Sequence, residues 1–371
     1  MTARERFVNC LSFRPVDRVF NMELGLWGQT YERWYAEGLP RYVLTGDWFS
    51  GEEYFGLDQR EFIPLHMGMI PEFDYETLEE DERTITFRGS DGVVHKALKE
   101  GTVGGTRPSM DQYLRFPVET RDDFVDMAAR HDPHLPIRYP SWWESRVRAW
   151  SVREHPLTLG TNGCLGLYSR LRQWMGTEGL SMAFYDQPAL VHEMLDFIVD
   201  FCLKLWRKAL ETTPIDHFNY FEDFAFKNGP LFSPDLFRTF FKHRYQTLND
   251  YLRAYGVELI TLDSDGNTEV LLAEMLDCGI NGHWPLERAA DMDPARIRRN
   301  FPQLALLGGV DKRELTKDRA AIREHLLTLV PVVEQGGFIP HIDHTVPHDV
   351  PYDNFLHYLE LKQKLLAGEA F

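Results

Sequence analysis

The sequence predicts an α/β fold, specifically a (β/α)8 TIM barrel, from three observations. Short apolar segments alternate with amphipathic helical patterns from about residue 156 to residue 366. Repeated strand–helix units of this kind favour a parallel sheet wrapped by helices. Most of the apolar segments end in acidic or histidine side chains. Because ligands bind at the carboxyl ends of barrel strands, these side chains are expected to surround one site.

The expected elements follow the chain in order. Seven strands are expected at residues 19–24, 156–160, 216–220, 257–262, 279–284, 304–309 and 338–342, and an eighth at 41–70 or 178–186, where the pattern is obscured. Helices are expected at 2–13, 29–37, 188–211, 234–255, 271–278, 294–301, 318–335 and 352–366. Pro15 marks the end of the first helix, since it disfavours helix at the preceding residue.

Residues 41–150 interrupt this rhythm. Thr84–Arg88 and Val93–Ala97 flank a Gly-Ser-Asp-Gly turn, which is typical of a β-hairpin. We expect this range to be an insertion that decorates a single barrel domain of residues 1–371. A doubly wound sheet is the alternative. It gains no support from nucleotide motifs, since there is neither a GxGxxG after the first strand nor a Walker loop.

Composition excludes several classes of protein. The chain has 371 residues, of which 43% are hydrophobic and 13% aromatic, so a full core can form. Its net charge of -17 disfavours nucleic acid and anionic membranes as partners. No signal peptide and no membrane span are predicted. Four separated cysteines, Cys10, Cys164, Cys202 and Cys278, are read as reduced structural thiols, so we expect a cytoplasmic protein.

Acids, amides and imidazoles gather at the predicted strand ends, above all in the stretch Gly336–Pro351. The candidate site residues at all these strand ends are Glu23, Asn162, Glu222, Asp223, Asp263, Asp265, His283, Asp311, His341, Asp343 and His344. Singly, each has a plain alternative: Asp263 and Asp265 fit an Asx-type turn, and Asp311 fits a helix N-cap. Together they favour an active site.

Two kinds of chemistry suit these residue types. Close carboxylates raise one another's pKa and can serve as general acids, and Glu222, Asp223, Asp263 and His344 are the expected catalytic residues. Carboxylates with histidines also suit a divalent metal such as zinc, for which the expected ligands are Asp263, Asp265, His341, Asp343 and His344. Substrate contacts are expected from Glu23, Trp27, Asn162, His283, Trp284 and Asp311.

Several stretches together resemble the uroporphyrinogen decarboxylase superfamily. They are Arg14–Val19 (RPVDRV), Glu222-Asp223 followed by Gly229–Pro234 (GPLFSP), Asp263–Asn267 (DSDGN), Gly308–Asp311 (GGVD), and Gly337–Pro340 (GFIP) through His344 and Pro347. The resemblance covers nearly the whole chain outside 41–150. It implies a (β/α)8 barrel, and it implies either a decarboxylase or a methyltransferase that works with a corrinoid protein.

The sequence departs from both the decarboxylase and the thiol-methylating branch of the superfamily, which limits the activities that we expect. The decarboxylase has an N-terminal arginine-rich segment for substrate carboxylates, whereas Glu23–Gly28 holds no arginine here. An octa-acid substrate would therefore be repelled. His344 matches the histidine of the decarboxylase's Gly-His-Gly segment, but its neighbours are Asp343 and Thr345. The thiol-methylating branch uses a His-x-Cys and a later Cys as zinc ligands, where this chain has Asp263-Ser264-Asp265 and Asp343.

Three functions remain open at this point. The first is a methyltransferase or demethylase that moves a methyl group from a small methoxylated or methylated donor to a corrinoid (cobalamin). The second is a decarboxylase of another small carboxylic acid, which would depend on Asp223 and His344. The third is a binding protein on a retained barrel, whose ligand binding would survive loss of Asp263, Asp265 and His344. A corrinoid protein is the expected partner, and the superfamily suggests a homodimer.

Overall fold

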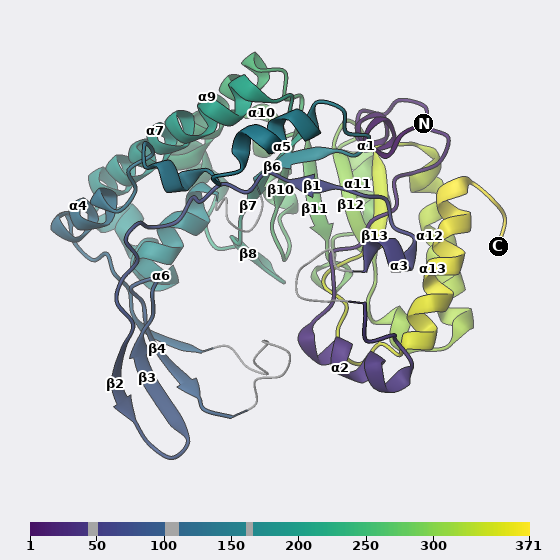
Figure 1. The fold of residues 1–371 in the computed structure, drawn as a ribbon, viewed down its shortest axis with the longest axis horizontal. Coiled ribbons are helices and arrows are strands. Elements are labelled where there is room, and N and C mark those ends of the chain that lie inside the picture. Colours follow the sequence, from purple (N-terminus) through teal and green to yellow (C-terminus); the bar gives the residue numbers. More distant parts are fainter. Residues whose placement is uncertain (44–50, 101–110, 161–165) are drawn as a thin grey trace.

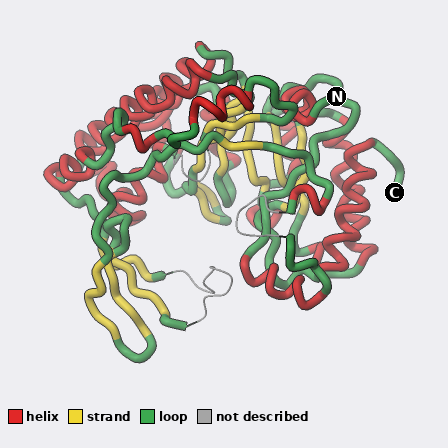
Figure 2. The backbone as a smooth tube through the Cα atoms, viewed as in Figure 1, coloured by secondary structure: helices red, strands yellow, loops and turns green. Residues whose placement is uncertain are grey.

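The computed structural model contains a curled, parallel sheet of seven strands with helices around it (Figures 1 and 2). The structure describes residues 1–43, 51–100, 111–160 and 166–371. In sheet order the strands are β1 (Glu61–Phe62), β6 (Leu157–Leu159), β7 (His217–Phe221), β10 (Leu259–Asp263), β11 (Gly282–Leu286), β12 (Ala305–Val310) and β13 (Phe338–Ile342). Every neighbouring pair is parallel. Six of the expected strands are thereby confirmed, and the obscured strand is β1.

Helices connect successive strands, as the alternation predicted. They are α1 (Ala3–Leu11), α2 (Gly28–Glu37), α3 (Glu52–Phe55), α4 (Arg121–Ala129), α5 (Trp143–Trp150), α6 (Leu167–Asp186), α7 (Pro188–Thr212), α8 (Pro234–Leu236), α9 (Lys242–Ala254), α10 (Leu272–Asp277), α11 (Pro294–Asn300), α12 (Arg319–Glu334) and α13 (Tyr352–Ala367). A π-helical turn, Phe237–Phe241, joins α8 to α9. The Ser233 side chain caps α8, and Pro234 occupies its first position as expected.

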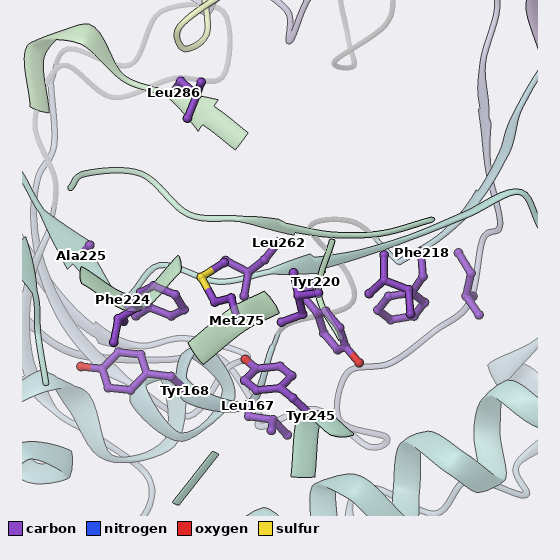
Figure 3. Packing of buried hydrophobic residues seen from close by; sticks show 14 of the residues in the cluster. Leu167, Tyr168, Phe218, Tyr220, Phe224, Ala225, Tyr245, Leu262, Met275 and Leu286 are labelled. Atoms are coloured by element: carbon purple, nitrogen blue, oxygen red, sulfur yellow. The ribbon is translucent and has the colours of Figure 1, made fainter. Parts of the chain in front are cut away.

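The two faces of the parallel sheet have different neighbours. Alternate residues such as Phe218, Ile260 and Leu306 belong to the large core shared with the helices, and we call this the outer face. Figure 3 shows part of that core, with Tyr220 and Tyr245 in edge contact at 5.0 Å between ring centroids. The intervening residues form the inner face. On it, Leu259 and Ile339 pack against side chains of the N-terminal segment.

The N-terminal segment 19–26 differs from its prediction. No strand forms over 19–24, and only Leu26 makes an isolated parallel bridge, to Val346. The segment nevertheless bonds to both ends of the sheet. The Asp58 N–H donates to the Asn21 carbonyl at 2.8 Å just before β1, and the Val346 N–H donates to the Gly25 carbonyl at 2.9 Å just after β13. Side chains replace the missing ladder, since Glu23 accepts from the Ile342 N–H.

A second, antiparallel sheet lies within residues 41–150. Its order is β2 (Glu76–Glu80), β3 (Thr84–Arg88), β4 (Val94–Leu98) and β5 (Gln112–Arg115), and it projects from the parallel sheet at the lower left of Figure 1. β3 and β4 pair antiparallel around the Gly-Ser-Asp-Gly turn. The same range also supplies β1 to the parallel sheet. A two-stranded ribbon, β8 (Ala225–Phe226) with β9 (Gly229–Pro230), follows β7.

The helices of this fold are short or polar relative to a bilayer-spanning helix. Within the described part of the chain, none combines the length and the apolar character that a membrane span requires.

Candidate functional site

Asp263 is the last residue of β10 and lies on the inner face of the sheet. It shares that face with Leu259 and Thr261, because side chains two residues apart in a strand point the same way. Its side chain is partly buried, and it makes no hydrogen bond or ion pair with the described residues. Burial raises the pKa of Asp263 well above its usual value, and the carboxylates of Asp265 and Asp223 raise it further. Asp263 is therefore an acid that keeps its proton more readily than an ordinary aspartate.

Asp265 and His344 form a pair beside Asp263. His344 Nε2 lies 3.2 Å from Asp265 Oδ2, and its ring stacks on Trp27 with centroids 6.0 Å apart and planes at 19°. Burial lowers the pKa of His344, but the hydrogen bond and charge of Asp265 outweigh burial, so the pKa is raised. The ends of β10 and β13 and the start of α2 are thus joined by the contacts of Asp265, His344 and Trp27. The structure brings Asp263, Asp265 and His344 close to one another.

Replacing Asp265 by asparagine is expected to lower the pKa of His344, because the charge that raises it is removed. The pKa of Asp263 should fall as well, since Asp265 is one of its two charged neighbours. NMR titration of the histidine ring and aspartate carboxyl carbons measures both. In the wild type the pair stabilises the fold at low pH, and this contribution is lost as pH rises through the raised pKa of His344. Unchanged titrations in the variant would contradict the arrangement.

Asp343 has a different environment from the other strand-end acids. It is fully buried and accepts from the Arg288 N–H at 2.9 Å and the Lys312 N–H at 3.1 Å. Burial raises its pKa to about 6, although Lys312 and these two N–H groups act in the opposite direction. Its carboxyl therefore joins the loops after β11 and β12 to the end of β13.

Lys312 and Glu287 were missed as site residues by sequence reasoning. Lys312 Nζ lies 3.1 Å from Glu287 Oε1 and 4.0 Å from Asp343 Oδ1, and both residues contribute to the field at His344. Glu287 is the first residue after β11, and Lys312 is the second residue after β12. That position was the signal that could have identified them.

Glu222 and Asp223 follow β7 and hold the start of α6. Glu222 is buried, and it accepts from the Tyr168 N–H at 3.1 Å, the Ser169 N–H at 2.8 Å and the Tyr245 hydroxyl. Burial raises the pKa of Glu222, while these hydrogen bonds lower it. A Cβ at Gly166 would lie only 2.1 Å from the Glu222 carboxylate, so this close approach needs glycine. Glu222 thus caps a helix, where its negative charge is favourable.

Asp223 is the more accessible of the two acids. It forms an ion pair with Arg172 of α6, and its backbone N–H donates to Ser169 Oγ at 2.7 Å. Its side chain is 38% exposed, and its charge contributes to the raised pKa of Asp263. Asp223 is therefore part of the same site as Asp263, whereas Glu222 is buried and holds the start of α6.

Trp284 and His341 lie on the inner face, and His283 does not. The Trp284 indole meets the His341 ring edge-on, with centroids 6.1 Å apart. His283 is directed to the outer side, where its Nε2 lies 2.8 Å from Thr268 Oγ1. Burial lowers the pKa of His283 to about 4 and that of His341 to about 3. Both imidazoles are therefore neutral at neutral pH.

Two further predicted residues, Glu23 and Asp311, have partners outside this group. Glu23 is buried against Lys362, with Oε1 and Nζ 2.6 Å apart. Asp311 is held by Arg313 through contacts of 2.6 and 2.8 Å, which lower its pKa against the effect of burial. Asn162 lies outside the described residues. Glu23 and Asp311 are thus each engaged in an ion pair, with Lys362 and Arg313 respectively.

The five residues predicted as zinc ligands do not form one ligand set. In the described ranges no three His, Cys, Asp or Glu side chains are grouped so as to hold a metal ion. Asp343 is engaged by two backbone N–H groups. His341 must donate its Nδ1 proton to the Ile342 carbonyl at 2.7 Å, and it lies within the buried inner layer. Among the described residues, the predicted set Asp263, Asp265, His341, Asp343 and His344 is therefore not gathered into a single metal centre, and nothing below depends on a metal.

Comparison with known proteins identifies the fold. Among solved structures, a methyltransferase from Methanosarcina mazei is 16% identical, with 98% of this chain and 99% of that chain covered and a TM-score of 0.61. At this identity the likeness shows the fold alone. A proposed vitamin-B12-independent methionine synthase from Listeria monocytogenes is 14% identical over 60% of this chain and 68% of that one, and its TM-score of 0.32 is too low to support an argument. The search of curated proteins returned no match.

The family is decided by the sequence match. The model of the uroporphyrinogen decarboxylase (URO-D) family matches residues 108–365, which include all strand ends from β6 to β13. This match spans well over half of the chain. The resemblance inferred from RPVDRV, DSDGN and GGVD agrees with it. The chain belongs to the uroporphyrinogen decarboxylase family.

Proposed function

We propose that this protein is a corrinoid-dependent methyltransferase or demethylase. It moves a methyl group from a small methoxylated or methylated donor to a cobalamin-type acceptor. The observation that carries the proposal is Asp263, an acid with a raised pKa whose side chain has no ion-pair or hydrogen-bond partner among the described residues, next to the Asp265–His344 pair. The fold shared along the whole chain with the Methanosarcina mazei methyltransferase supports it.

Asp263 supplies the step that an ether donor needs most. A methoxy oxygen is a poor leaving group, and a positioned acid lowers the barrier by protonating it as the carbon–oxygen bond breaks. The reduced cobalt of the acceptor provides the electron pair for the new bond to the methyl carbon. The Asp263 proton passes to the departing oxygen, which leaves as a hydroxyl group, and Asp263 is then reprotonated from water. Asp265, fixed by His344, favours the protonated form of Asp263 at the start.

Trp27 and the cations complete the role of the chain's own residues. Trp27 is 39% exposed beside His344 and offers an aromatic surface to a donor. Two cations lie on opposite sides of Asp263: Arg172 pairs with Asp223, and Lys312 pairs with Glu287.

We also infer that segment 19–26 takes the place of the eighth barrel strand, since it is hydrogen-bonded to residues next to both β1 and β13.

The test is direct measurement of methyl transfer. The purified protein is incubated with free cob(I)alamin, prepared by chemical reduction, and a panel of methoxylated aromatic and aliphatic compounds. Methylcobalamin formation is followed by its absorbance and by mass spectrometry. We expect at least one donor to give methylcobalamin with the wild type and far less with Asp263→Asn. No methylcobalamin from any donor would overturn the proposal.

A decarboxylase of a small carboxylic acid is the second candidate. It is favoured by Arg172 and Lys312, which could exchange their present partners for a substrate carboxylate, and by the name of the family. Its sign would be release of carbon dioxide without any corrinoid, lost in Asp223→Asn and His344→Ala. Release of carbon dioxide together with no methylcobalamin would favour this candidate over the first.

A further inference from the structure

The Trp284 indole crosses the inner face of the sheet next to Asp263. Asp263 and Trp284 are register partners on β10 and β11, and the Ser264 N–H donates to the Trp284 carbonyl at 2.9 Å. The indole Nε1–H donates to Asn219 Oδ1 at 2.7 Å. Asn219 is on β7, the strand on the opposite side of β10. To reach it, the indole must pass across β10 on the same face as the Asp263 side chain.

A chain of hydrogen bonds fixes Asn219 in its turn. Asn219 Oδ1 also accepts from the Thr261 hydroxyl at 2.6 Å, so the oxygen of that hydroxyl must accept a hydrogen bond from His217 Nε2 at 2.7 Å. His217 Nδ1 is then an acceptor, and the Thr158 hydroxyl at 3.1 Å is its donor. Every proton in the chain therefore points toward Asn219. Burial lowers the pKa of His217 to about 3, so the chain carries no charge.

His341 lies on the other side of the indole and is also uncharged. Its Nδ1 donates to the Ile342 carbonyl, and its Nε2 has no hydrogen-bond partner in the described part of the chain. Among the described residues, the two charges that raise the pKa of Asp263 come from the strand ends: Asp265, paired with His344, and Asp223, paired with Arg172 of α6. The inner side of Asp263 thus meets a neutral layer in which Trp284 is the largest side chain.

We infer that Asn219 is a positioning residue that holds the Trp284 indole against the inner side of Asp263 and so keeps water from reaching the carboxyl from that side. An aspartate beside apolar surface favours its protonated form, because the charged form loses its hydration there. The consequence is that the acid retains its proton until a leaving group takes it. The inference rests on the proposed function only in treating Asp263 as the proton donor.

The experiment is an NMR titration of Asp263 without substrate. The protein is labelled with 13C at the aspartate carboxyl carbon, and the Asp263 signal is assigned as the one missing from Asp263→Asn. In Asn219→Ala and in Trp284→Leu the titration midpoint of Asp263 should shift downward, because water replaces the indole. Tyr220→Phe is the matched control, since it removes a buried hydroxyl bond to Asn249 from the same strand on the outer face. Its midpoint should equal that of the wild type.

Each outcome bears on the inference. A lower midpoint in both inner-face variants and an unchanged one in the control supports it. Unchanged midpoints in folded Asn219→Ala and Trp284→Leu overturn it, as does an equal shift in Tyr220→Phe. If Asn219→Ala does not fold, Trp284→Phe decides, since it keeps an aromatic ring but cannot donate to Asn219. Because the titration requires no methyl transfer, its result stands whether or not the proposed activity is found.

Discussion

Replacing Asp263 by asparagine should lower the rate of methyl transfer from an ether donor by about 10²- to 10⁴-fold, the usual contribution of a positioned general acid. Asparagine has nearly the same shape, so donor binding should change little and the loss should appear in kcat. The measurement is the initial rate of methylcobalamin formation with free cob(I)alamin. A donor whose leaving group departs without a proton should be affected far less, which provides an internal comparison.

The pH dependence gives a second test of the same residue. The acid must be protonated at the start, and burial with two neighbouring carboxylates raises its pKa. The rate is therefore expected to be constant on the acid side and to fall as pH rises through that raised value. Asp265→Asn should move the falling limb to lower pH, since one of the carboxylates has lost its charge. Asp263 would not be the general acid if Asp263→Asn kept the wild-type rate, or if Asp265→Asn left the falling limb of the pH–rate profile at the same pH.

The parallel sheet could be predicted from the sequence because the patterns that indicate its strands and helices are local. Buried strands such as 338–342 are short apolar runs between turn residues, and helices such as 319–334 repeat their apolar positions along one face. The rule that ligands bind at strand carboxyl ends then brought Asp263, Asp265 and His344 together. The N-terminal segment 19–26 escaped this reasoning. Its sequence resembles a strand, but side-chain hydrogen bonds such as that of Glu23 replace the backbone ladder.

The predicted site was only partly right because strand-end position does not decide the partner of a side chain. Asp263 is the last residue of β10 and Asp343 directly follows β13, yet the Asp343 carboxylate accepts two backbone N–H groups and the Asp263 carboxylate accepts none from the described residues. His283 and Trp284 are neighbours, and a single step along the strand sends them to opposite faces. Glu222 accepts a hydrogen bond from Ser169 at the start of α6, 53 residues away in the sequence. Such long-range contacts have no local signature, so the metal set could not have been rejected beforehand.

The largest effect on stability is expected from Lys362→Met, which leaves a buried acid without its cation. Lys362 is fully buried on α13, and its Nζ donates to Glu23 Oε1 and to the Met22 carbonyl, both at 2.6 Å. Breaking one partner of a buried ion pair costs about 3–5 kcal/mol. Glu23 would keep only the Tyr358 hydroxyl at 2.5 Å and the Ile342 N–H at 2.9 Å. Unfolding in urea, followed by circular dichroism, measures the loss.

Two further variants separate charge from packing in this test. Lys364→Met, two residues along the same helix, removes a lysine that is 40% exposed and pairs with Glu360 at 3.5 Å. It should cost roughly 0–1 kcal/mol, as exposed pairs do. The double variant Glu23→Gln with Lys362→Met should recover part of the loss, since no unpaired charge remains. A Lys362→Met protein as stable as Lys364→Met would show that the pair does not hold segment 19–26 against β13. Because Glu23 accepts from Ile342, which directly precedes Asp343 and His344, loosening this pair should also broaden the NMR signals of the His344 ring.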